Sequence, residues 1–329
     1  MKIAIDAMGG DHAPLETVKG AIDALVHIES EIVFIGDEEA INRELEKYKY
    51  DAARISVVHT SEVVTGEDKP VRAIKSKKDS SMVVGLDGLR KNEYDAFISA
   101  GNTGALLAGG LLKVGRIKGI DRPALCSVYP TKNGMSILTD AGANADCKPR
   151  NLKEFGIMGS LYAQNVLGID NPRVGLANIG HEEGKGNSLV IEAYDLLKET
   201  NLNFIGNVEA RDIPDGATDI IVCDGFTGNI ILKLSEGVAK SFTTMIKEIF
   251  MKSPLTKVAA LLVKNGLGDM KKSMDYTEYG GAPLLGVKGL VVKAHGSSNA
   301  KAFMNAIRYA EKTAASGVVD KIAAEVQAS

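Results

Sequence analysis

The sequence lacks tryptophan altogether, and aromatic residues make up only 5% of its 329 residues. Proteins that bind single-stranded nucleic acid or carbohydrate rely on aromatic side chains that stack on the ligand, so neither function fits. An excess of positive charge is missing as well, because 39 basic and 42 acidic side chains give a net charge of −3. A protein that wraps DNA carries a positive surface, and we therefore expect no nucleic-acid partner.

Cysteine and long apolar runs are also scarce. The cysteines Cys126, Cys147 and Cys223 form no C-x-x-C pair and have no zinc-site spacing, which indicates a reducing compartment. The chain opens with a strand-like segment in place of a charged and then apolar leader, and no run approaches the roughly 18 apolar residues of a membrane span. We expect a cytoplasmic protein without a signal peptide.

The remaining composition is that of a globular protein, with 45% hydrophobic and 25% charged residues. Short apolar segments alternate with segments of helical periodicity, which predicts a mostly parallel sheet covered by helices. No linker-like segment divides the chain, so we predict one large α/β unit over residues 1–329, either undivided or in two lobes. The predicted strands are Lys2–Asp6, Glu31–Ile35, Ile55–His59, Asp95–Ser99, Met135–Asp140, Arg173–Asn178, Asn203–Gly206, Asp219–Cys223 and Gly289–Ala294.

Glycine is abundant, with 35 residues, and much of it follows the predicted strands. Ligands of parallel sheets bind beyond the carboxyl ends of the strands. Two loops there share one pattern, Gly101-Asn102-Thr103-Gly104 and Gly225-Phe226-Thr227-Gly228. Backbone N–H groups and a threonine hydroxyl at a helix start can bind phosphate. The alternative for any one loop is an ordinary helix cap.

Known nucleotide and hydrolase motifs are absent. Gly180–Gly186 resembles a P-loop, but its spacing is wrong and Gly186 stands where the motif needs serine or threonine after Lys185. There is no complete G-x-G-x-x-G fingerprint and no G-x-S-x-G elbow. Asp6, Asp11 and His12 fit a turn better than a metal site. We therefore expect neither a cofactor nor a metal.

Two cationic or titratable residues are candidates for the site. Lys185 lies among glycines and Asn187 at a predicted helix start, where it can bind an anion or remain a solvated loop lysine. His295 directly follows an apolar strand, where it can polarise a carbonyl, bind phosphate or make a buried structural hydrogen bond.

Two local surfaces are hidden by the small net charge. A helix beginning at Pro70 carries a basic face that suits an acidic partner, or is simply solvated. Residues 240–272 predict a projecting helical hairpin, with apolar residues at helical spacing after Pro254 and lysines beside them. This segment is either a core helix or a helix that lies on an anionic membrane.

The loops as a set resemble those of the bacterial phosphate acyltransferases of phospholipid synthesis. The resemblance runs from residue 1 to about 315, and Ala141 departs from it where valine is more usual. The segments that carry it are Asp6–Asp11, Lys69–Ser81, Ser99–Gly104, Arg122–Ala124, Asp140–Asn144, Glu183–Asn187, Asp224–Asn229, Tyr279–Gly286 and His295–Ser298.

The resemblance implies a three-layer α/β/α fold like that of the isopropylmalate dehydrogenase and phosphotransacetylase group. It implies transfer of a long fatty acyl chain from acyl carrier protein to inorganic phosphate. A membrane acyltransferase would then pass the chain from acyl phosphate to glycerol 3-phosphate. A homodimer attached peripherally to the inner face of the cell membrane is also implied.

The implied reaction needs no Ser-His-Asp triad, because phosphate is already an anion and a thiolate is a competent leaving group. The enzyme has to bind phosphate about 3–3.5 Å from the thioester and stabilise an oxyanion. We predict catalytic or orienting roles for Lys185, Asn229, His295 and Asp224. The predicted phosphate-binding residues are Gly101, Asn102, Thr103, Gly104, Asn187, Thr227 and Gly228.

Two surfaces complete the prediction. The basic residues Arg72, Lys75, Lys77 and Lys78 are expected to dock the acidic carrier protein, and Leu255, Val258 and Leu262 to contact the membrane. Two other functions compete with this one. One is a metal- and NAD-dependent dehydrogenase of the same fold group, but this sequence lacks the dinucleotide-binding fingerprint. The other is a non-catalytic membrane scaffold, which would leave the polar loops without a function.

Overall fold

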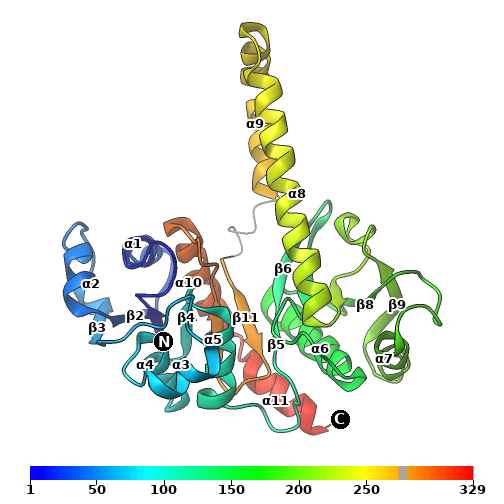
Figure 1. Cartoon of the computed structure of the whole chain (residues 1–329), viewed down its shortest axis with the longest axis horizontal. Coiled ribbons are helices and arrows are strands. Elements are labelled where there is room, and N and C mark those ends of the chain that lie inside the picture. The colour runs from blue at the N-terminus through cyan, green and yellow to red at the C-terminus, as the bar shows by residue number, and fades with distance from the viewer. Residues whose placement is uncertain (274–279, 329) are drawn as a thin grey trace.

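The computed structural model describes residues 1–273 and 280–328. It contains a seven-stranded and a five-stranded sheet side by side, and a helical hairpin that projects away from both (Figure 1). The parallel character and the flanking helices are as predicted, but the strands form two sheets where the sequence analysis expects one. The single-domain assignment of residues 1–329 stays a prediction.

The seven-stranded sheet has the order β3-β2-β1-β4-β12-β11-β5. The first five strands are parallel, and β11 is antiparallel to both of its neighbours. Except in the edge strand β3, their inner residues are buried on both faces, so these strands read as continuous apolar runs. The bounds are β1 Lys2–Asp6, β2 Glu31–Gly36, β3 Ile55–His59, β4 Ala96–Ser99, β5 Ala124–Leu125, β11 Ala282–Leu285 and β12 Leu290–Lys293.

Helices cover both faces of this sheet. One core cluster lies under α1, α2 and α10, and another lies under α3, α4 and α5. The bounds are α1 Leu15–Ala24, α2 Glu38–Leu45, α3 Pro70–Ser76, α4 Ser81–Arg90, α5 Thr103–Gly109 and α10 Ala300–Ala315, with a π-helical extension of α5 at Gly110–Val114 and a 3₁₀ turn at Ala52–Arg54.

The five-stranded sheet has the order β6-β7-β10-β8-β9, with β6 antiparallel and the other strands parallel. Helices α6, α7 and α11 pack on one face, and the first turns of α8 pack on the other. The bounds are β6 Ser127–Thr131, β7 Gly134–Thr139, β8 Arg173–Asn178, β9 Asn203–Glu209, β10 Ile220–Val222, α6 Pro149–Tyr162 (extended by a π-helix at Ala163–Leu167), α7 Ser188–Lys198 and α11 Val318–Ala328, with a 3₁₀ turn at Ile213–Asp215.

The projecting hairpin consists of α8 Gly225–Met251 and α9 Pro254–Ser273 (Figure 1). The break lies where Pro254 begins the second helix and the Ser253 hydroxyl accepts from the backbone N–H of Thr256. In α8 only Gly225 and Gly228 are buried, so the helix leaves the core after its first turn. Within the described part of the chain, no helix is long and apolar enough to span a bilayer.

The sequence analysis does not predict strands β5, β6 and β11 or helices α4 and α11. β5 has two residues, and β6 and β11 carry Pro130 and Pro283, which sequence patterns assign to turns. These short strands matter, because the chain passes from one sheet to the other between β5 and β6 and returns to the first sheet at β11.

Candidate active site

A cavity of about 280 Å³ lies between the two sheets, where carboxyl ends of strands face each other. Thr103, Lys293 and His295 line it from the seven-stranded sheet. Gly142, Asn229 and Lys233 line it from the loop after β7 and from α8. A cavity with convergent polar groups at such a crevice is the expected position of an active site in α/β proteins.

Lys293 is the last residue of β12 and the central cation of the cavity. Its Nζ donates to the carbonyl oxygen of Gly101 at 2.8 Å. Burial is the main reason that the pKa of Lys293 is lowered to about 8; the charge of Lys233 also acts to lower it, and the carboxylates of Asp6 and Asp11 act to raise it. The ammonium group is therefore charged at neutral pH and still available to an anion.

Asp6 holds the loop beneath this lysine. Its buried carboxylate accepts from the hydroxyls of Ser81 at 2.6 Å and Ser99 at 2.7 Å. The Ser99 Oγ in turn accepts from the N–H of Gly101 at 3.0 Å. Burial raises the pKa of Asp6, while the two hydroxyls and the charge of Lys293 act against that rise. Because Lys293 holds the carbonyl of Gly101, both peptide groups of this glycine are fixed.

His295 and Lys233 meet across the cavity, one from the loop after β12 and the other from α8. The Nζ of Lys233 lies 3.3 Å from the Nε2 of His295 and 2.8 Å from the carboxylate of Glu236. The Nδ1 of His295 lies 2.8 Å from the Ser297 hydroxyl. Burial, and then the charge of Lys233, lower the pKa of His295. In a neutral ring with its proton on Nδ1, Nε2 accepts from Lys233 and Nδ1 donates to the Ser297 hydroxyl; in the other tautomer Nδ1 accepts from the backbone N–H of Ser297 at 3.3 Å.

Asp140 fixes the wall that faces Lys293. Its carboxylate accepts from the backbone N–H groups of Leu125, Gly142, Ala143 and Asn144 at 2.7–3.1 Å. Burial raises the pKa of Asp140, and these hydrogen bonds oppose the rise. The segment after β7 is thereby held rigidly against the start of α8.

Thr103, Asn229 and His295 are the predicted site residues that line the cavity. Asn102 is close by but caps α5, because its Oδ1 accepts from Ala105 N–H at 3.0 Å. Asp224 is likewise the cap of α8 and accepts from both the N–H and the hydroxyl of Thr227. The side chains of Asn102 and Asp224 are therefore helix caps, the alternative that the sequence analysis gives for these loops.

The predicted glycines have packing roles. A Cβ on Gly228 would lie 1.9 Å from the carbonyl oxygen of Asp140, and one on Gly104 would lie 2.7 Å from Pro70. Gly101 contributes its backbone to the Lys293 and Ser99 contacts described above. The two matching loops therefore share a packing role as well as a position: in each, a glycine lets the helix lie close to a neighbouring segment.

Lys185 and Asn187 do not line the cavity. Lys185 is exposed, and its carbonyl oxygen accepts from the side-chain amide of Asn178 at 2.9 Å. Asn187 caps α7 by accepting from Val190 N–H at 3.1 Å. The loop around them folds onto β8, so the structure separates these residues from the other predicted site residues.

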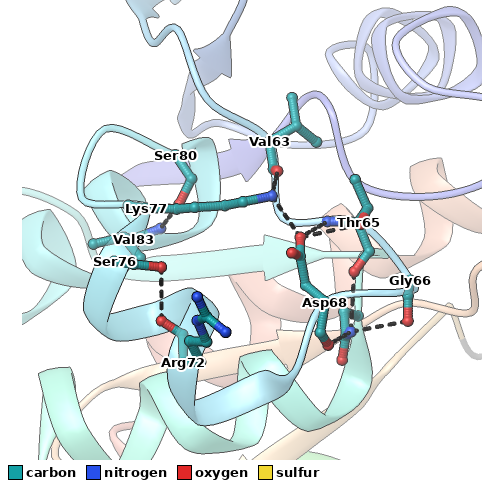
Figure 2. Close-up of polar contacts among 10 residues, drawn as sticks. Val63, Thr65, Gly66, Asp68, Arg72, Ser76, Lys77, Ser80 and Val83 are labelled. Carbon is teal, nitrogen blue, oxygen red and sulfur yellow. Dashed lines mark hydrogen bonds and ion pairs between the residues drawn. The ribbon is translucent and has the colours of Figure 1, made fainter.

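Lys77 of the predicted docking face is already engaged. Its Nζ lies 2.6 Å from the carboxylate of Asp68 and donates to the carbonyl of Val63 (Figure 2). The pKa of Asp68 is lowered mainly by this hydrogen bond. Lys77 therefore orders the loop before α3.

The remaining basic residues, Arg72, Lys75 and Lys78, are exposed on or just after α3. Within residues 1–273 and 280–328 none of the three forms an ion pair. Figure 2 shows Arg72 bonded to Ser76 through its main-chain carbonyl.

The predicted membrane residues lie on α9, from Leu255 next to the turn of the hairpin to Leu262 near the middle of the helix. Leu255 is 79% exposed and Leu262 is 83% exposed, with Val258 between them on α9. Apolar side chains this exposed on a projecting element are unusual unless something covers them. Within a single chain, α9 is therefore not a core helix.

Lys293, Lys233 and Asp6 are site residues that the sequence analysis does not single out as functional. Lys293 gives a weak signal, because a lysine ends the otherwise apolar strand Leu290–Lys293. Nothing in the sequence marks Lys233 as a site residue, because it lies in a long amphipathic helix where a lysine is expected to face solvent.

One side-chain cluster has the geometry of a metal site among the described residues. His181, Glu209 and Asp212 offer ligand atoms within 4.8 Å of one another. Arg211 lies 2.9 Å from the carboxylate of Glu209 and already supplies positive charge there. The cluster is remote from the cavity lining and carries no role in the site.

Comparison with known proteins agrees with the geometry. The family model described as fatty acid synthesis protein matches residues 1–321. The phosphate acyltransferase of Alkaliphilus oremlandii is 61% identical over 322 residues, covering 98% of this chain and 96% of the relative. That of Clostridioides difficile is 56% identical over 323 residues, covering 98% and 95%.

Among solved structures, a phosphotransacetylase from Streptococcus pyogenes superimposes with a TM-score of 0.61 at 17% identity, covering 95% of this chain and 94% of that one. This likeness confirms the three-layer α/β/α fold. Together with the sequence relatives, it leads to one conclusion: the chain belongs to the family of phosphate acyltransferases, and it is an acyltransferase enzyme.

Proposed function

We propose that the enzyme transfers a fatty acyl group from an acyl carrier protein thioester to inorganic phosphate in the cavity between the two sheets. The observation that carries the proposal is the convergence of Lys293, Lys233 and His295 on one cavity. Two ammonium groups there can neutralise a phosphate dianion, and the side chains beside them can orient its oxygens.

In the proposed step, a phosphate oxygen attacks the thioester carbonyl carbon. The new C–O bond forms as the C–S bond breaks, and the proton of hydrogen phosphate ends on the departing thiolate. Asn229 and Thr103 line the cavity, and their side-chain amide and hydroxyl are donors that suit the developing oxyanion. Lys293 and Lys233 hold the nucleophile in place, so orientation supplies much of the rate.

Neutral His295 suits this chemistry. When Lys233 turns from Nε2 of His295 to the bound phosphate, Nε2 can accept the proton of hydrogen phosphate during the attack and pass it to the departing thiolate. Its lowered pKa keeps it unprotonated at pH 7. The exposed basic residues of α3 support docking of an acidic carrier, and the exposed tip of α9 supports contact with an anionic membrane.

The product is a mixed anhydride that is more reactive than the thioester toward an alcohol. We infer that a membrane acyltransferase uses it to acylate glycerol 3-phosphate, which accords with an apolar tip on this enzyme. The experiment that tests the reaction mixes the purified protein with palmitoyl carrier protein, with and without phosphate. Release of free carrier thiol should require phosphate, and release at the same rate without phosphate would contradict the proposal.

A further inference from the structure

The active-site cavity contains a carboxylate that the proposed reaction does not use. Glu236 lines the cavity from α8, about one helical turn after Lys233. Among the described residues of the cavity lining it is the only acidic side chain. A negative charge in a cavity that binds a phosphate dianion weakens this binding, because like charges repel each other. The role of Glu236 therefore has to lie in the groups that its carboxylate contacts.

The carboxylate of Glu236 contacts Lys233. Its Oε2 lies 2.8 Å from the Nζ of Lys233, and the same Nζ lies 3.3 Å from the Nε2 of His295. Residues three positions apart share one face of a helix, so α8 itself holds the pair together. Burial, and then the charge of Lys233, lower the pKa of His295, while the carboxylate of Glu236 acts to raise it. The three side chains therefore influence one another within the cavity.

The ion pair between Lys233 and Glu236 is exposed enough to break and form again. The side chain of Lys233 is 50% exposed and that of Glu236 is 23% exposed. Such a pair contributes little to stability, because water screens the charges and both side chains lose freedom. A lysine ammonium is also a point charge on a flexible stem. Lys233 can therefore leave Glu236 for an anion in the cavity and return to it afterwards.

Lys293 differs from Lys233 in this respect. Its Nζ donates to the neutral carbonyl oxygen of Gly101 at 2.8 Å, and the residue ends a strand of the sheet. Phosphate can bind Lys293 without displacing a carboxylate, whereas at Lys233 it has to replace the carboxylate of Glu236. The cavity thus combines a fixed cation with a second cation for which an anion has to compete.

We propose that Glu236 is a positioning residue, which competes with bound phosphate for the ammonium group of Lys233 and so helps the phosphate-bearing product to leave. The inference rests on the proposed function and adds a role for a residue that does not take part in the reacting bonds. Tight binding of phosphate in substrate and product alike would not speed the chemical step, because only interactions that are stronger in the transition state do so. A competitor for one of the two cations lowers this uniform binding and still leaves Lys233 available during the attack.

The test replaces Glu236 by glutamine, which keeps the shape of the side chain and removes its charge. By calorimetry without any acyl carrier, Glu236→Gln should bind inorganic phosphate about fivefold more tightly than the wild type, the factor expected for removal of an exposed ion pair. Inhibition of turnover by added palmitoyl phosphate should become stronger by the same factor. The matched control is Glu44→Gln on α2, which breaks the ion pair with Lys47 at the same i,i+3 spacing and should leave both values unchanged.

The part played by Lys233 is tested by the same substitution in a Lys233→Met background. A double-mutant cycle isolates the coupling between the two residues, and the gain in phosphate affinity should be clearly smaller there, because only direct repulsion remains. Glu236→Asp, which keeps the charge, should bind phosphate more nearly as the wild type does. All of the Glu236 variants should unfold at the wild-type temperature, since the pair contributes little to stability.

Unchanged or weaker phosphate binding in Glu236→Gln would overturn the inference. An equal gain with and without Lys233 would overturn it as well, because Glu236 would then act on phosphate directly. Both results leave the proposed reaction standing, since the wild type still binds phosphate in each. Wild-type protein that binds no inorganic phosphate would contradict the reaction and the inference together.

Discussion

The Nζ of Lys293 lies 2.8 Å from the carbonyl oxygen of Gly101. This contact joins the last residue of β12 to the loop after β4, because the two strands are parallel neighbours in the seven-stranded sheet. It fixes the ammonium group of Lys293 in a cavity whose other wall comes from the second sheet.

Replacing Lys293 by methionine should lower kcat/KM for phosphate by about 10²-fold, because the variant lacks a charge that stabilises the anion in the transition state. Steady-state kinetics at several phosphate concentrations measure this effect. Lys185→Ala serves as the comparison, since Lys185 is exposed and outside the cavity, and its phosphate KM should stay within about twofold. If Lys185→Ala lost phosphate binding while Lys293→Met kept it, the phosphate site would lie in the loop at Lys185, as predicted from the sequence, and not in the cavity.

The pH dependence follows from the pKa of Lys293, which is lowered to about 8. The charged form binds phosphate and predominates below that pKa, so kcat/KM for phosphate should fall as pH rises through about 8. The groups that face Lys293 are Asp6, Asp11, Lys233 and His295. Lys293→Arg should remove this alkaline decline, because guanidinium stays protonated; an identical decline in that variant would assign it to another group.

The same shift predicts the sign of a stability effect. The folded-state pKa of Lys293 is below its usual value of 10.5, so the unfolded chain binds more protons between about pH 8 and 10.5 and the contribution of Lys293 to the free energy of unfolding rises over that range. Denaturant titrations of the wild type and Lys293→Met compare the slopes. Equal slopes in this window would contradict the lowered pKa.

Asp6→Asn should destabilise the protein by about 1–3 kcal/mol, because a buried acceptor of two hydroxyls is replaced by an amide that pairs with them imperfectly. Thermal unfolding measures this loss. The kinetic signature should be a higher phosphate KM, since the loop at Gly101 loses its support. Unchanged stability and KM together would show that Ser81 and Ser99 hold the loop without Asp6.

Charge reversal of Arg72, Lys75 and Lys78 to glutamate should raise the KM for carrier protein about tenfold at low salt, and less at high salt because the attraction is screened. A control with the same change in net charge reverses the exposed residues Lys19, Lys49 and Lys118. Equal effects in both triple variants would mean that overall charge, and not this face, attracts the carrier.

Much of the fold could be predicted from the sequence, because strand and helix patterns are local properties. The hairpin is a clear case, since Pro254 interrupts a long helical periodicity. The division into two sheets could not be predicted, because it depends on which strands become neighbours. Short strands that contain proline, such as β6 and β11, carry the crossings between the sheets.

The candidate site was predicted in part. Thr103, Asn229 and His295 follow strands and do line the cavity. Asp224 and Asn102 also follow strands, but their side chains cap helices. The sequence cannot distinguish a polar side chain that caps a helix from one that binds a ligand. Lys293 could not be predicted from the sequence, because only the pairing of β12 with β4 brings it to Gly101.

The most direct test of the central claim follows the phosphate itself. Purified enzyme is incubated with palmitoyl carrier protein and radiolabelled inorganic phosphate, and the lipid fraction is extracted. The account predicts labelled palmitoyl phosphate in amounts equal to the free carrier thiol released, with about 10²-fold slower formation in Lys293→Met. Release of carrier thiol with all of the label remaining in inorganic phosphate would contradict it.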